Sequence, residues 1–211
     1  MRVGAVLDLA AQLLSPALCV ACDARVGRGQ PFCTACEPSL LPEHARGADV
    51  AAFEFGGAIA RAITRYKYES QPWLGVPLGA LAATALERLS RPFDLVTHVP
   101  LHPERLAWRG FDQSALLARE VASAAGRPLQ YALLVRTSRT EQQARKGRAA
   151  RLQNVRGAFT TDVRGRAYFE GRAVLLVDDV RTTGATLRAC TEALLAGGAG
   201  DVQTLVVARD A

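Results

Sequence analysis

One segment of the 211-residue chain, residues 173–186, limits its fold more than any other. It begins with five apolar residues, Ala173–Val177, and continues with two adjacent acids, Asp178 and Asp179. A Thr-Thr-Gly-Ala-Thr turn follows at 182–186 and leads into an amphipathic segment. Ligands in open α/β sheets bind beyond the carboxyl ends of the strands. The segment therefore predicts a buried strand, a ligand-binding turn and a helix within an α/β domain.

The turn has the composition of a phosphate-binding site. Backbone N–H groups at the start of a helix attract phosphate, and Gly184 allows a close approach of the backbone. The three threonine hydroxyls of the turn are further donors. The two preceding acids repel that phosphate, and they suit sugar hydroxyls or a hard cation near a second phosphate. The pattern favours a sugar phosphate with free hydroxyls over the alternative, an ordinary turn with two solvated acids.

Strand-like and helix-like segments alternate over the rest of the chain. Helical patterns occur at residues 53–66, 76–89, 114–125 and 186–195, and strand patterns at 94–100, 173–177 and 202–207. Strands separated by helices imply a mainly parallel sheet flanked by helices. The basic, polar segment 136–156 interrupts this order and has the composition of a functional loop or a disordered segment.

Four of the five cysteines form two Cys-x-x-Cys pairs, Cys19 with Cys22 and Cys33 with Cys36. Doubled pairs at this spacing are typical of a structural zinc site, in which four thiolates surround one tetrahedral ion and leave no open position for catalysis. Iron in the same site is an open alternative. Two disulfides are disfavoured because we expect no export signal. Cys190, in a helical pattern, is expected to be a core residue.

Composition and charge set further expectations. Apolar residues make up 49% of the chain, enough for a sizeable core, and a net charge of +6 suits anionic ligands. The sequence contains no run of about 20 apolar residues, so we expect no membrane span. The apolar stretch 1–18 suits an amphipathic helix better than a lipoprotein signal, because Asp8 and Gln12 interrupt it. We expect a cytoplasmic protein with an N-terminal helix and four-cysteine zinc ribbon at 1–48 and the α/β domain at 49–211.

The string at 173–186 resembles the phosphoribosyl-pyrophosphate signature of type I phosphoribosyltransferases. That resemblance implies that Asp178 and Asp179 hold the ribose hydroxyls, with Mg²⁺ on the ribose and pyrophosphate oxygens of 5-phosphoribosyl 1-pyrophosphate. It also implies a loop around the 5-phosphate that consists of Thr182, Thr183, Gly184, Ala185 and Thr186. Hypoxanthine-guanine members have an aspartate base at the position of Thr182, so a transferase here would need a base elsewhere or a nucleophile that needs none.

The chain as a whole resembles the ComF family of competence-associated, phosphoribosyltransferase-like proteins. The matching features, besides the cysteine pairs and the acid pair with its turn, are Tyr66-Lys67-Tyr68, Val99-Pro100-Leu101, Arg109-Gly110-Phe111, Gln142-Gln143-Ala144-Arg145 and the run from Arg151 to Phe159. The family usually has Asn at the position of Asp112. The resemblance implies a role in DNA uptake or recombination. Competence or recombination proteins are candidate partners, and the basic segment and the zinc module suggest single-stranded DNA as another.

These patterns supply candidate residues and two open functions. The candidate catalytic residues are Asp178, Asp179, Lys67 and Arg109. Arg105 is a candidate for binding pyrophosphate, because guanidinium forks match phosphate oxygens. The basic loop adds candidates for pyrophosphate or nucleic acid, which are Arg145, Lys146, Arg148 and Arg151. The first function is a phosphoribosyltransferase with an unknown acceptor, and the second is a non-catalytic nucleic-acid-binding accessory protein with a ligand-sensing pocket.

Overall fold

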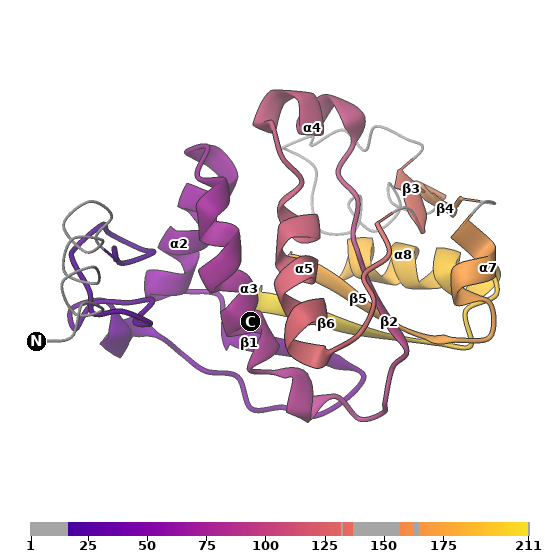
Figure 1. Cartoon of the computed structure of the whole chain (residues 1–211), viewed down its shortest axis with the longest axis horizontal. Coiled ribbons are helices and arrows are strands. Elements are labelled where there is room, and N and C mark those ends of the chain that lie inside the picture. The colour runs from indigo at the N-terminus through magenta and orange to yellow at the C-terminus, as the bar shows by residue number, and fades with distance from the viewer. Residues whose placement is uncertain (1–16, 132, 137–156, 163–164, 211) are drawn as a thin grey trace, which may run out of the picture.

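Figure 1 shows the computed structural model of the chain, which describes residues 17–131, 133–136, 157–162 and 165–210. Its central sheet consists of β1 (Asp49–Glu54), β2 (Leu95–His98), β5 (Ala173–Arg181) and β6 (Asp201–Arg209). The strands lie in the order β1-β6-β5-β2, and every neighbouring pair is parallel. The predicted parallel sheet is therefore confirmed, and all four strands end at the same edge.

Helices cover both faces of this sheet (Figure 1). The described α-helices are α2 (Gly57–Tyr68), α3 (Gly75–Ala83), α4 (Pro103–Arg109), α5 (Gln113–Ala125), α7 (Arg166–Phe169) and α8 (Ala185–Ala196), of which α4 buries no residue. Helices α3 and α5 pack against one face, and α8 packs against the other. A short antiparallel pair, β3 (Leu134–Arg136) with β4 (Phe159–Thr161), contacts α8. The sheet is thus the middle layer of three.

Apolar side chains of the sheet divide between two cores, because successive residues of a strand point to opposite faces. Leu175 and Val177 of β5 pack with α2, α3 and α5, whereas Val174 and Leu176 pack with α7 and α8. Strands buried on both faces need nearly continuous apolar sequence. The apolar run that begins at Ala173 meets this need, which explains why β5 was predictable.

Two predicted helices were partly wrong. Residues 53 and 54 belong to β1, and the helix predicted at 53–66 begins only at Gly57. The φ of Gly57 is +49°, a left-handed conformation that separates the strand from the helix. The helix predicted at 76–89 ends at Ala83, after which Thr84 donates its hydroxyl to the carbonyl of Leu81 at 2.7 Å and a 3-10 turn follows at Leu86–Arg88. A side-chain hydroxyl that bonds the preceding turn competes with helix continuation.

The four-cysteine module packs onto the main core. Cys19, Val20, Phe32 and Cys36 are buried in the same hydrophobic cluster as Ile59 of α2. The boundary predicted at residues 48 and 49 stays a prediction, as does the N-terminal helix, which falls largely on residues outside the described ones. No described helix is long and apolar enough to cross a membrane.

Candidate functional site

The acid pair lies near the carboxyl end of β5, and both carboxylates are buried. Asp178 Oδ1 accepts hydrogen bonds from Ser114 Oγ at 2.7 Å and from the backbone N–H of Asp179 at 2.9 Å. Asp179 Oδ1 lies 2.7 Å from Lys67 Nζ. The second oxygen, Asp179 Oδ2, is buried and has no hydrogen-bond partner among the described residues. A buried carboxylate oxygen without a donor is a site for a ligand hydroxyl or cation.

Burial and mutual repulsion set the ionisation of this cluster. Burial, followed by the charge of Asp179, raises the pKa of Asp178 to about 7, although the Ser114 hydrogen bond and the Lys67 ammonium oppose the change. Burial also opposes the charge on Lys67, but the ion pair with Asp179 outweighs it and raises the Lys67 pKa. Near neutral pH Asp178 is therefore poised between its two forms, and donors from a ligand would favour the ionised form.

A cavity of about 350 Å³ opens onto the acid pair. Basic side chains from three other elements line it: Lys67 from α2, Arg105 from α4 and Arg136 from β3. Burial lowers the pKa of the Arg136 guanidinium, and the positive charge of nearby Arg105 lowers it further, because two basic groups lie close together in the cavity. Acids and basic groups in one cavity can contact a ligand that carries both hydroxyls and phosphates.

The predicted phosphate turn adjoins this cavity. Gly184 caps the N-terminus of α8 with a φ of +72°, a left-handed conformation that strains residues with a side chain. The backbone N–H of Ala185 donates to Thr183 Oγ1 at 3.4 Å. Thr182 and Thr186 line the acid-pair cavity. The turn residues are thus brought to the carboxyl end of β5, as the sequence predicted.

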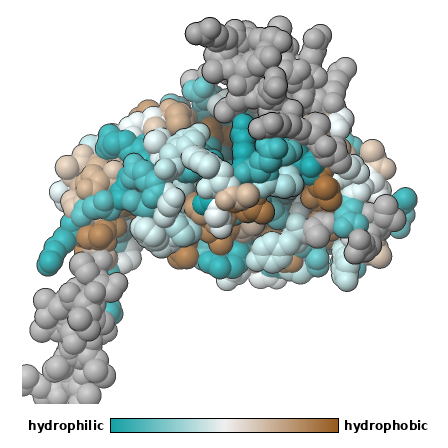
Figure 2. All heavy atoms as spheres, turned by 90° about the horizontal axis from the view of Figure 1, so that it is seen from above, coloured by the Kyte–Doolittle hydropathy of each residue, from teal (hydrophilic) through white to brown (hydrophobic). Residues whose placement is uncertain are grey.

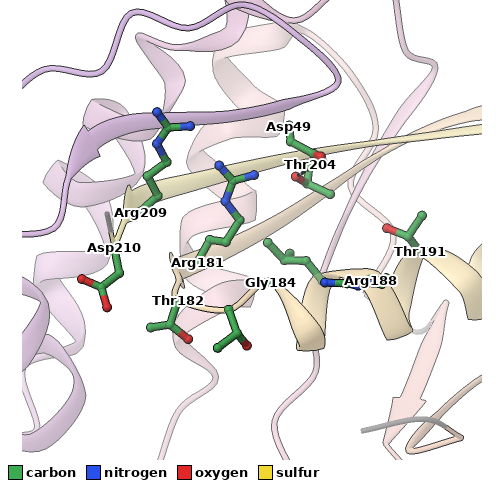
Figure 3. A pocket seen from close by; sticks show the side chains of 11 residues that line it. Asp49, Arg181, Thr182, Gly184, Arg188, Thr191, Thr204, Arg209 and Asp210 are labelled. Atoms are coloured by element: carbon green, nitrogen blue, oxygen red, sulfur yellow. Dashed lines mark hydrogen bonds between the residues drawn. The ribbon is translucent and has the colours of Figure 1, made fainter. Parts of the chain in front are cut away.

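A second cavity, of about 620 Å³, lies beside the turn (Figure 3). Thr183 and Gly184 line this second cavity, and Thr182 lines both. The turn is therefore a wall shared by two cavities. The second cavity is also lined by charged residues, which are Asp49, Arg181, Arg188, Arg209 and Asp210. The chemistry that needs paired carboxylates belongs to the smaller cavity, because only its lining includes Asp178 and Asp179.

Asp112 has a structural role at the start of α5. Its Oδ1 accepts the backbone N–H of Ala115 at 3.1 Å, and its Oδ2 accepts the backbone N–H of Leu101 at 3.1 Å. Burial opposes the charge on Asp112, but His98, 3.6 Å away, and the two backbone donors outweigh it and lower the Asp112 pKa. The carboxylate therefore caps the helix and ties it to the segment after β2. It does not line the acid-pair cavity.

Other predicted residues lie elsewhere. Arg109 ends α4 with its guanidinium 5.6 Å from the centre of the Tyr68 ring, and it does not line the acid-pair cavity. Its catalytic role stays a prediction. Four basic candidates fall outside the described residues: Arg145, Lys146, Arg148 and Arg151. Figure 2 shows hydrophilic residues interspersed with hydrophobic ones on the coloured part of the face seen from above.

The four cysteines of the N-terminal module converge on one point. Their sulfur atoms all lie within 4.8 Å of one another, and Cys22 Sγ lies 3.6 Å from both Cys33 Sγ and Cys36 Sγ. Zinc with four thiolates at about 2.3 Å requires this spacing. Burial opposes ionisation of Cys19, but backbone donors led by Cys33 outweigh it and lower its pKa to about 7. The module can therefore hold one tetrahedral metal ion.

Three important residues were not among the predicted ligands. Ser114, which orients Asp178, was expected only as the start of a helix, and Arg136 only as part of a polar segment. Arg65 binds the cysteine module through a buried side chain. A hydroxyl two residues after a helix N-cap was the available signal for Ser114. The sequence held no signal for Arg65, because its partners are distant in the chain.

Comparisons with known proteins agree with this geometry. Residues 112–211 match the phosphoribosyl transferase domain, so the matched region contains the acid pair and the turn. Competence protein F of Haemophilus influenzae is 31% identical over 70% of this chain and 66% of its own length. Competence protein ComFC of Streptococcus pneumoniae is 26% identical over 91% of this chain and 87% of its own length. DNA utilization protein YhgH of Salmonella typhi is 32% identical over 55% of this chain and 49% of its own length.

The chain thus spans about half the length of the DNA utilization relative and just under two thirds of competence protein F. Among solved structures, glutamine phosphoribosylpyrophosphate amidotransferase from B. subtilis is 25% identical and aligns with 67% of this chain and 30% of its own, with a TM-score of 0.46. The sequence matches, the phosphoribosyl transferase domain and the four-cysteine cluster together show that the chain belongs to the ComF family of phosphoribosyltransferase-like proteins.

Proposed function

We propose that this protein binds 5-phosphoribosyl 1-pyrophosphate together with Mg²⁺ in the acid-pair cavity. The observation that carries the proposal is a buried carboxylate pair with one oxygen unsatisfied among the described residues, in a cavity that also contains basic side chains. The carboxylates of Asp178 and Asp179 accept the ribose hydroxyls, and the Thr-rich turn binds the 5-phosphate. Mg²⁺ would neutralise charge on the pyrophosphate oxygens.

We further propose that the protein transfers the phosphoribosyl group to an acceptor. The bond between C1 of the ribose and the pyrophosphate oxygen breaks and pyrophosphate leaves with the electron pair, while a nitrogen of the acceptor forms the new bond to C1. Lys67, Arg105 and Arg136 line the cavity where the departing charge develops. Thr182 cannot act as the base, since a hydroxyl is a poor proton acceptor. The acceptor nitrogen therefore either loses its proton to a base other than Thr182 or is a nucleophile that needs no base.

The relatives named as competence and DNA utilization proteins support a role in DNA uptake or utilization. Partners consistent with that role are single-stranded DNA and competence or recombination proteins. All five cysteines are free, and four converge on a metal site. Free thiols and a thiolate metal site fit a reducing compartment and support a cytoplasmic location.

A second candidate function is a non-catalytic nucleic-acid-binding protein whose pocket senses the sugar pyrophosphate. The observation in its favour is a set of exposed aromatic side chains, with Tyr68, Trp73 and Trp108 exposed by 59%, 63% and 71%. Aromatic side chains that are open to solvent can stack with bases of a single strand. The arginine beside Tyr68 would add electrostatic attraction for phosphate.

Calorimetry with the sugar pyrophosphate and Mg²⁺ tests the binding proposal. The Asp178→Asn/Asp179→Asn variant should lose at least ~100-fold in affinity, because each hydrogen bond to a charged group contributes about 1.5–3 kcal/mol. The matched control is Asp94→Asn/Asp201→Asn, which removes the same charge beside the opposite ends of β5 and β6. Equal affinities of both double variants and the unaltered protein would refute the proposal.

Release of pyrophosphate separates the two candidate functions. The donor, Mg²⁺ and a panel of nucleobases and amines are incubated with the protein, and free pyrophosphate is measured. Acceptor-dependent release that disappears in Asp178→Asn/Asp179→Asn supports transfer. Tight binding without release for any acceptor favours the sensing function.

A further inference from the structure

Three consecutive residues near the end of α2 contact three different parts of the protein. A helix turns by about 100° per residue, so Arg65 and Lys67 point to nearly opposite sides of α2. Arg65 reaches the cysteine module, Tyr66 donates its hydroxyl to the carbonyl of Gln113 at 2.8 Å, and Lys67 pairs with Asp179 at 2.7 Å. One turn of helix thus connects the metal module, the start of α5 and the acid pair.

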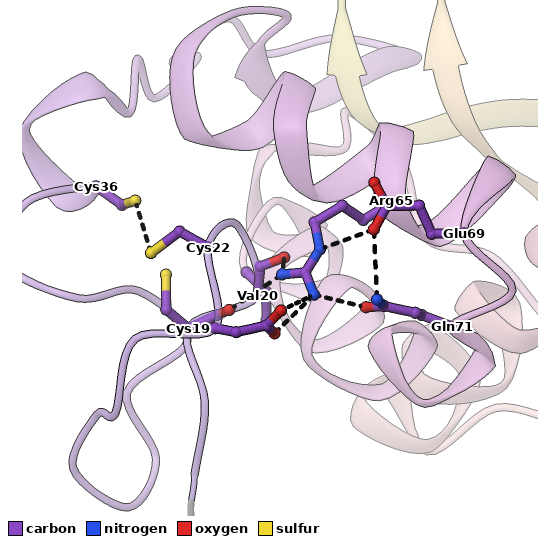
Figure 4. Close-up of polar contacts among 8 residues, drawn as sticks. Cys19, Val20, Cys22, Cys36, Arg65, Glu69 and Gln71 are labelled. Carbon is purple, nitrogen blue, oxygen red and sulfur yellow. Dashed lines mark hydrogen bonds and ion pairs between the residues drawn. The ribbon is translucent and has the colours of Figure 1, made fainter.

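Arg65 binds the first cysteine pair through several groups at once (Figure 4). Its Nη1 donates to the carbonyl of Val20 at 3.2 Å and to that of Cys19 at 3.5 Å. Its Nη2 donates to both carboxylate oxygens of Asp23, at 2.6 Å and 2.5 Å. Only 10% of the Arg65 side chain is exposed. These carbonyls belong to the turn that carries two of the four converging thiols, Cys19 and Cys22. A change in the conformation of that turn would therefore alter the hydrogen bonds of the guanidinium.

Lys67, two residues after Arg65 on α2, lies against the acid pair. Its side chain is 19% exposed, and that of Asp179 is 5% exposed, so the ion pair is largely removed from solvent. The side chain of Arg65 also bonds Glu69 and Gln71, just beyond the end of α2. A rotation of the last turn of α2 that frees Arg65 would therefore move Lys67 away from Asp179.

We propose that Arg65 is a positioning residue through which the metal-loaded cysteine module holds Lys67 at the acid pair, so that the module is a working part of the ligand site. The proposal rests on the proposed function for its effect on ligand affinity. The coupling itself concerns two contacts of this chain and can be measured without ligand. Coupling between two sites commonly amounts to a 5- to 150-fold effect on affinity, and we expect a loss on the order of tenfold.

The lysine content of the chain makes the coupling visible by NMR. Lys67 and Lys146 are the only lysines, so ¹⁵N-lysine labelling gives two side-chain ammonium signals. In the full-length, zinc-loaded protein, Arg65→Met should shift or broaden the Lys67 signal. Arg166→Met is the matched control, because it removes an arginine from an exposed ion pair on α7. An unchanged Lys67 signal in Arg65→Met would overturn the proposal.

A double-mutant cycle distinguishes positioning from general destabilisation. Arg65→Met should weaken binding of the sugar pyrophosphate about tenfold in the unaltered background, and much less in a Lys67→Met background, since the lysine that it positions is gone. Equal losses in both backgrounds would contradict the proposal. Asp23→Asn is the gentler alternative if Arg65→Met does not fold. If the unaltered protein binds no sugar pyrophosphate, the proposed function fails, and the NMR comparison still decides the coupling.

Discussion

Replacing Asp178 by asparagine should stabilise the protein at high pH while it weakens ligand binding. Both hydrogen bonds at this carboxylate are accepted by Oδ1, so an asparagine amide oxygen can keep the Ser114 and Asp179 donors. What the substitution removes is a buried negative charge beside a second carboxylate. Ligand sites often retain such unfavourable charges because binding needs them.

The magnitude follows from the ionisation of this carboxyl. Its pKa lies at about 7 in the folded protein instead of the ordinary 3.8. Each tenfold change in the ionisation constant corresponds to about 1.4 kcal/mol, so the ionised form costs at most about 4 kcal/mol of stability. The folded protein binds more protons than the unfolded chain between these two values. The contribution of Asp178 to the stability of the folded protein therefore falls as the pH rises from about 4 to about 7 and is constant above.

Urea unfolding of the ligand-free protein at several pH values measures how the free energy of unfolding changes with pH. Asp178→Asn should equal the unaltered protein near pH 4 and exceed it at pH 8, by an amount up to about 4 kcal/mol. Asp94→Asn, which removes an exposed carboxylate at the other end of β5, serves as the control. A stability difference for Asp178→Asn that is the same at pH 4 and pH 8 would refute the electrostatic reasoning.

Two further predictions concern the turn and the metal module. Gly184→Ala places a side chain at a φ of +72°, which should cost about 1–2 kcal/mol in unfolding free energy and weaken sugar-pyrophosphate binding by calorimetry; unchanged stability would show that the turn is not left-handed in solution. Removal of metal by a strong chelator should lower the melting temperature, and Cys33→Ser should lower it without chelator, because four thiolates surround one position. A melting curve that does not respond to either change would exclude a structural metal.

The sequence predicted those parts of the site that one segment encodes. The acid pair, the turn and α8 follow one another along the chain, and the apolar run before Asp178 made the buried strand evident. The strand β1 was missed because its short sequence has two alanines and runs into a helical pattern. Strand β1 could be recognised only from its pairing with β6, which joins residues far apart in the chain.

Contacts between distant elements were the least predictable part of the site. Lys67 was a candidate catalytic residue, but its ion pair with Asp179 depends on how α2 lies relative to β5. The family resemblance indicated Asp112 as a departure, and only the structure shows it as a helix cap. Local spacing determines which residues could bind a ligand. The order of the strands determines which of them meet.

A crystal structure with the sugar pyrophosphate and Mg²⁺ tests the central claim most directly. Our account predicts the ribose hydroxyls within hydrogen-bond distance of Asp178 and Asp179, and the 5-phosphate on the backbone of the Thr-rich turn. The account would be contradicted by ligand that occupies only the neighbouring cavity beside Arg181 and Arg188. In that case Asp178 and Asp179 would contact only Ser114 and Lys67, as in the free protein.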